Sequence, residues 1–102
     1  MPNEATLKRA CVKEVRDRGG WAKSAPQGIH SAGMADLFGV YRRVALVIET
    51  KMPGKEKNLT KLQATTLEQA GAAGAVARVV TTKQQMAAIL DAVDRKLDKK
   101  KK

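Results

Sequence analysis

Residues 33–51, GMADLFGVYRRVALVIETK, constrain the fold most, because they have the pattern of two strands joined by a tight turn. Strands are expected at Asp36–Tyr41 and Val44–Lys51, and the two arginines between them form the turn. Tyr41 then pairs with Val44, and this turn fixes the register of every other pair in the hairpin. The continuously apolar run VALVI is typical of a central strand that is covered on both faces.

The same register brings two carboxylates together. Asp36 is expected directly opposite Glu49, and opposed residues in a hairpin have Cβ atoms roughly 4.5–5.5 Å apart. Like charges that close are destabilising, and a divalent cation with oxygen ligands would relieve the repulsion. Lys51 is two residues beyond Glu49, so its side chain points to the same face. The pattern predicts a site that holds a metal ion and handles the charge of a phosphate.

The composition favours a small, basic, folded domain. The chain has 102 residues, of which 43% are hydrophobic and only 3% aromatic, so one mainly aliphatic core is expected. The formal net charge of +10 indicates a polyanionic partner, which could be DNA, RNA or an anionic membrane. Residues 95–102 hold six Lys or Arg and one Asp, a net +5, so the other 94 residues carry the remaining +5.

Two kinds of protein are disfavoured by what the sequence lacks. Cys11 is the single cysteine, which excludes an intrachain disulfide and a cysteine-based zinc site, and we expect it to be a buried small hydrophobe. There is no signal-peptide pattern and no apolar run near 18 residues, so an intracellular protein without a membrane partner is expected.

Apolar periodicity and helix-capping signals predict the rest of the secondary structure. Two capping boxes, Thr60 with Gln63 and Thr82 with Gln85, mark the starts of two helices, and Gly71 is expected to end the first of them. The element order is helix, three strands, helix, strand, helix. The additional elements are helices at 4–17, 60–71 and from 82 to at least 97, and strands at 21–25 and 75–80.

In order and spacing, the charged residues resemble the PD-(D/E)XK nuclease superfamily, and more narrowly its VRR-NUC (virus-type replication-repair nuclease) branch. That family has an acid in a first helix, a Gly-x-x-Asp turn into a strand, Glu-x-Lys on the next strand and a Gln on the following helix. Here these are Glu4, Gly33-Met34-Ala35-Asp36, Glu49-Thr50-Lys51 and Gln63. Ala35 stands where the superfamily often has Pro, a departure that concerns how the preceding loop approaches DNA.

The resemblance implies an α/β fold and a function. The fold is a single domain at residues 1–98 of αβββαβα order, with a restriction-endonuclease-like core and a mixed central sheet flanked by helices. Residues 99–102 form a basic tail. The function is that of a Mg²⁺- or Mn²⁺-dependent endonuclease that hydrolyses DNA phosphodiester bonds. Structure selectivity for branched DNA such as Holliday junctions, a homodimer, and a bacterial or phage source are also implied.

The resemblance also assigns roles to residues. Glu4, Asp36, Glu49 and the backbone carbonyl of Thr50 would bind the metal. Asp36, Glu49, Lys51 and Gln63 would form the catalytic set. Lys51 would orient or deprotonate the attacking water, or stabilise the pentavalent phosphate.

Several of these residues also have ordinary structural explanations. Gln63 fits a capping box, so its side chain could bond only to the Thr60 backbone. Glu4 in a first turn favours the helix dipole. Arg42 and Arg43 are either phosphate contacts or solvated turn charges, and His30, the sole histidine, is expected at the surface or on DNA rather than as a general base.

Two other functions compete with the nuclease. The first is a basic nucleic-acid-binding module in which the acids are structural. The second is a ribosome- or membrane-associated basic protein, which accounts for the tail but not for the paired carboxylates. Metal binding with cleavage would favour the nuclease, whereas salt-sensitive binding alone would favour the module.

Overall fold

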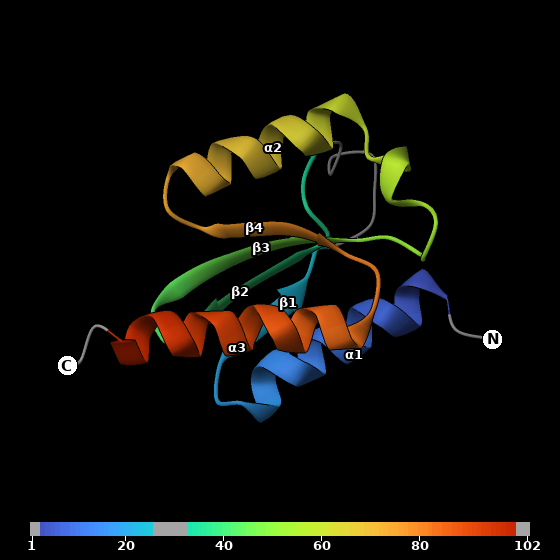
Figure 1. Ribbon diagram of the computed structural model, residues 1–102. Coiled ribbons are helices and arrows are strands. Elements are labelled where there is room, and N and C mark those ends of the chain that lie inside the picture. The colour runs from blue at the N-terminus through green and yellow to red at the C-terminus, as the bar shows by residue number, and fades with distance from the viewer. Residues whose placement is uncertain (1–2, 26–32, 100–102) are drawn as a thin grey trace.

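The computed structural model describes residues 3–25 and 33–99, and it contains the expected elements in the expected order (Figure 1). The helices are α1 (Glu4–Asp17), α2 (Lys61–Ala72) and α3 (Lys83–Lys99), and a short 3₁₀ helix, η2 (Glu56–Asn58), precedes α2. The strands are β1 (Trp21–Ser24), β2 (Leu37–Tyr41), β3 (Val44–Thr50) and β4 (Val76–Val80). The predicted αβββαβα order is confirmed.

The four strands form one mixed sheet in the order β1-β2-β3-β4. β2 runs antiparallel to both of its neighbours, β1 and β3, and β4 runs parallel to β3. Tyr41 pairs with Val44 and Leu37 pairs with Ile48, which confirms the predicted register. β3 is therefore an interior strand, as its apolar run indicated.

Helices cover both faces of this sheet. In Figure 1, α1 and α3 lie on one face and α2 lies on the other. The core is the layer between the sheet and the pair α1 and α3, where Cys11, Leu37, Ile48 and Leu90 are fully buried. Burial raises the pKa of the Cys11 thiol to about 11, so Cys11 is the buried hydrophobe that was predicted. None of the helices in the described ranges is long and apolar enough to cross a bilayer.

The hairpin turn has an unusual sequence for its backbone conformation. Arg42 and Arg43 both have positive φ, 51° and 69°, as a two-residue turn between twisted strands requires. Residues other than Gly and Asn adopt this backbone conformation at a cost in free energy. Arg42 offsets that cost by pairing with Asp94 at 2.8 Å and Asp98 at 3.1 Å on α3. Arg42 is therefore an anchor of the hairpin and not an unpaired, solvated turn charge, while a contact with phosphate stays a prediction.

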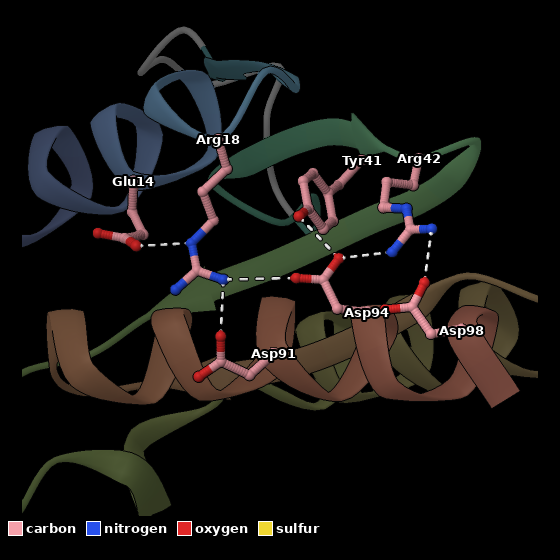
Figure 2. Close-up of polar contacts among 7 residues, drawn as sticks. All are labelled: Glu14, Arg18, Tyr41, Arg42, Asp91, Asp94 and Asp98. Carbon is pink, nitrogen blue, oxygen red and sulfur yellow. Dashed lines mark hydrogen bonds and ion pairs between the residues drawn. The ribbon is translucent and has the colours of Figure 1, made fainter.

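Arg42 belongs to a network of hydrogen bonds and ion pairs that also includes six further residues (Figure 2). We call this network the polar clasp. Arg18 at the end of α1 donates to Glu14 and to Asp91, each at 2.8 Å. The Tyr41 hydroxyl donates to Asp94 at 2.8 Å. The hydrogen bond from Arg42 holds the pKa of Asp94 below its ordinary value. The clasp joins α1, the hairpin and α3, and its members are Glu14, Arg18, Tyr41, Arg42, Asp91, Asp94 and Asp98.

The end of α2 and the capping of α3 differ from the prediction. α2 continues through Gly71 to Ala72, and the chain turns away at Gly74, whose φ of +110° only glycine adopts freely. The capping box of α3 is only half formed, because the Gln85 side chain accepts from the Thr81 amide and not from that of Thr82. The loop with His30 and the last residues of the basic tail lie outside the described ranges.

Candidate metal centre and catalytic site

Three carboxylates meet where α1 begins, β2 begins and β3 ends. Glu4, Asp36 and Glu49 each place a carboxylate oxygen within 4.8 Å of the other two. Glu4 is in the first turn of α1, whose start is fixed by the Asn3 side chain accepting from the Thr6 amide at 2.9 Å. The fold thus gathers the three acids that were singled out as metal ligands.

Asp36 reaches this cluster by a route that differs from the expected one. The strand pairing ends at Leu37 and Ile48, so Asp36 lies just before β2 and is not an opposed strand residue. Its carboxylate instead accepts from the Thr50 amide at 3.0 Å and from the Thr50 hydroxyl at 2.8 Å, one bond to each oxygen. Asp36 is close to Glu49 because its side chain caps the end of β3.

The turn before Asp36 requires glycine at its first position. Gly33 has a φ of +80°, and a Cβ added there would lie 2.9 Å from the Cβ of Leu62 on α2. The Thr66 hydroxyl, also on α2, donates to the Gly33 carbonyl. The helix therefore packs directly on the turn and holds Asp36 in place. This explains physically why the Gly-x-x-Asp pattern begins with Gly.

Glu49 is a buried carboxylate with an unsatisfied oxygen. Its residue is 3% exposed, and Oε1 has no hydrogen-bond partner among the residues that the structure describes. Burial, and then the charge of Asp36, raise the pKa of Glu49 to about 7, while Lys51 opposes the shift. A buried polar atom without a partner is destabilising. Its position among acidic neighbours fits a hard divalent cation, which prefers carboxylate oxygens.

The Gln63 side chain takes part in the capping box and also contacts Glu49, and its catalytic role stays a prediction. Its Oε1 accepts from the Thr60 amide at 3.0 Å, and its backbone N–H donates to the Thr60 hydroxyl at 3.0 Å. Its Nε2 donates to Glu49 Oε2 at 3.1 Å. The capping box is complete, and it orients the side chain that reaches the site.

Lys51 lies beside Glu49, as the alternation of strand side chains predicted. Its Nζ is 3.5 Å from Glu49 Oε2, and its side chain is 15% exposed. Its backbone amide donates to the Val80 carbonyl at 3.0 Å, which holds the end of β3 against β4. The site thus combines three carboxylates with one ammonium group.

Thr50 has a function that the sequence did not reveal. It was expected to offer only its backbone carbonyl to a metal, and that role stays a prediction. Its amide and hydroxyl instead hold Asp36. The sequence feature that could have indicated this contact is a hydroxyl residue between Glu49 and Lys51, at the strand end where Asp36 was expected.

Comparison with solved structures connects this geometry to a known fold. The chain is similar to a structure described as "VRR_NUC domain", with a TM-score of 0.70 and 20% sequence identity, over 86% of this chain and 94% of that one. No family model and no curated protein matches the chain. The chain therefore has the fold of the VRR_NUC domain, as the resemblance of its charged motifs implied.

Proposed function

We propose that this protein is a metal-dependent endonuclease that hydrolyses DNA phosphodiester bonds. One observation carries the proposal: Glu49 buries an oxygen, Oε1, that has no hydrogen-bond partner among the described residues, and its carboxylate lies in a cluster with Asp36 and Glu4. A fold shared with a VRR_NUC domain supports nuclease chemistry at this position. The net charge of +10 supports a polyanionic substrate.

The acidic cluster fits Mg²⁺ or Mn²⁺, held by Glu4, Asp36, Glu49 and the Thr50 carbonyl. Such an ion would polarise the scissile phosphate and make a bound water more acidic. The chain's own contribution is to fix the ligands before substrate arrives. Thr50 holds Asp36 by two hydrogen bonds, and Gln63 holds Glu49 by one. Ligands positioned in this way need little rearrangement in the transition state.

Lys51 would act on the phosphate. Its ammonium group lies 3.5 Å from Glu49 and remains partly accessible, so it can donate to a phosphate oxygen next to the acids. A donor aimed at the place where charge develops lowers the barrier most when solvent is scarce. We assign Lys51 the stabilisation of phosphate charge and the orientation of the attacking water.

We further propose that the substrate is branched DNA and that two copies of the chain act together. Two sites in a homodimer would cut two strands of one junction. Both statements rest on the resemblance to junction-cutting nucleases. Cleavage of a four-way junction, a flap, a nicked duplex and a plain duplex would test the first. Light scattering of the protein with and without DNA would test the second, and a monomer in both samples would contradict it.

The central test is cleavage by matched variants in Mg²⁺, Mn²⁺ and EDTA. Wild type should cut with either metal and not in EDTA. Glu49→Gln should lose metal binding and cleavage together. Lys51→Ala should keep Mn²⁺ binding in calorimetry, yet its cleavage rate should fall by about 10²-fold or more, as for loss of one transition-state donor. Glu68→Gln, which removes an exposed acid from α2, should behave as wild type.

Two outcomes would contradict the proposal. The first is a near wild-type rate for Glu49→Gln. The second is salt-sensitive DNA binding by the wild type without cleavage of any substrate, which would favour a non-catalytic binding module.

A further inference from the structure

A groove of ≈ 520 Å³ lies between α1 and the edge strand β1, and its lining shares no residue with the acidic cluster. Four cationic side chains line it, Arg9, Lys13 and Arg16 from α1 and Lys23 from β1, together with one acid, Asp17. We call it the α1–β1 groove. Neither the metal centre nor the polar clasp uses any of these five side chains.

The side chains that line the groove carry a net positive charge, and the other residues described by the structure do not neutralise it. Lys13 pairs with Asp17 at 2.6 Å, so these two charges cancel. Arg16 donates through Nε and Nη2 to the Ala22 carbonyl, a neutral acceptor, at 3.1 and 2.9 Å. Arg9 and Lys23 have no acidic partner within the described ranges. Four cations against one acid leave a net charge of +3 along the groove.

The unpaired cations of the groove contrast with the paired charges on α3. The acids of α3 are each tied to an arginine of the polar clasp, so cations near them are compensated. The α1–β1 groove is a concave surface whose positive charge remains available, and such surfaces attract anions.

The spacing of the cations fits a phosphate backbone. Arg9, Lys13 and Arg16 follow one another at i, i+4 and i+7, so they lie along one side of α1. The seven residue steps from Arg9 to Arg16 span about 10 Å of helix axis. One strand of duplex DNA carries a phosphate about every 3.4 Å of its axis, so about three phosphates match this length.

The groove also adjoins the candidate metal centre. Ser24 lines the groove, and the next residue, Ala25, donates its amide to the Asp36 carbonyl at 2.8 Å. Helix α1 supplies both Glu4 to the acidic cluster and the arginines of the groove. A strand lying in the groove would therefore be close to the acids.

We propose that the α1–β1 groove is a nucleic-acid contact that holds the phosphodiester backbone of a substrate strand beside the metal centre. The proposal rests on the nuclease function for its purpose, but the contact itself can be measured without cleavage. Its determinants are Arg9 and Lys23, since these side chains form no ion pair and no hydrogen bond with the rest of the described chain.

The test measures binding of a fluorescently labelled duplex and a labelled four-way junction in EDTA, over a series of salt concentrations. The double variant Arg9→Gln/Lys23→Gln should flatten the slope of log K against log salt by up to about 1.8, that is, about 0.9 for each lost phosphate contact. Its affinity at about 0.1 M salt should fall roughly tenfold or more. The melting temperature should stay that of the wild type.

Two control variants separate the groove from total charge and from packing. Arg95→Gln/Lys96→Gln removes the same charge from exposed positions on α3 and should leave the affinity close to that of wild type. Arg9→Lys/Lys23→Arg keeps the charge and should also bind normally. Trp21, the sole tryptophan, lies two residues from Lys23 and is 53% exposed, so its emission should change when DNA is bound.

Several results would overturn the proposal. These are equal affinity and slope for the groove variant and the α3 control, an unchanged Trp21 emission at saturating DNA, and stronger binding of polyglutamate than of DNA at equal charge and salt. The nuclease proposal fails separately, because binding in EDTA is independent of whether the wild type cuts in Mg²⁺.

Discussion

Replacing Glu49 by Gln should stabilise the metal-free protein at alkaline pH, although it destroys the site. The ionised carboxylate is buried beside Asp36, and these effects raise its pKa from 4.5 to about 7. Each pH unit between the unfolded and folded pKa values corresponds to about 1.4 kcal/mol. The ionised form of Glu49 therefore destabilises the fold by up to about 3 kcal/mol above pH 7.

The sign follows from proton binding. Between pH 4.5 and about 7 the folded protein binds the Glu49 proton more tightly than the unfolded chain does, so wild-type stability falls as pH rises through this window. Gln cannot ionise, and its amide can donate to an acidic neighbour. The stability of Glu49→Gln should therefore lack this decline. The two proteins should be similar at pH 4.5 and differ most above pH 7.

The assay is urea unfolding and thermal unfolding in EDTA at several pH values, with circular dichroism as the signal. A gain of 1 kcal/mol raises the melting temperature of a domain this size by about 4–8 °C. Added Mn²⁺ should then raise the melting temperature of the wild type but not of the variant, because only the wild type binds the ion. A variant that is less stable than wild type at pH 8 in EDTA would refute this account of Glu49.

Three further predictions concern other parts of the molecule. Thr60→Ala and Gln63→Ala should each lower the free energy of unfolding by about 1 kcal/mol through loss of the α2 cap, but only Gln63→Ala should also slow cleavage; equal rates would limit Gln63 to capping. Asp94→Asn should lower the melting temperature at pH 7, because the Asp94 pKa lies below its ordinary value. That difference should close as pH falls through the folded pKa, and a gap independent of pH would contradict the role of its charge. Deleting Lys99–Lys102 should flatten the salt dependence of DNA binding by up to about 0.9 per lost contact, and an unchanged slope would mean that the tail does not touch DNA.

The architecture could be predicted because its local signals agree with one another. The two-residue turn fixed the hairpin register, and Asn3 and Thr60 marked the starts of α1 and α2. The end of α2 was missed because Gly71 occupies a helical position, while the left-handed residue that stops the helix is Gly74. Glycine composition alone cannot separate these two uses.

The site was predicted less fully than the fold. The hairpin register and the alternation of strand side chains correctly predicted that Asp36, Glu49 and Lys51 lie together. The register argument, however, assumed that the two acids form a strand pair. The Thr50 contacts to Asp36 depend on side-chain geometry at a strand end, which periodicity does not describe. The α1–β1 groove was missed for a related reason, since Arg9 and Lys23 become neighbours only when α1 packs against β1.

The three helices hold the domain together to different degrees, and this bears on how the site fails under stress. α3 buries three side chains and α1 buries two, whereas α2 buries only Leu67. Local opening costs least where the least apolar surface is buried, so α2 should detach before the rest of the domain unfolds. Detachment removes Gln63 from Glu49 and Thr66 from the Gly33 turn. The site would thus lose these contacts at temperatures at which the core remains folded. Amide hydrogen exchange should accordingly be faster in α2 than in α3.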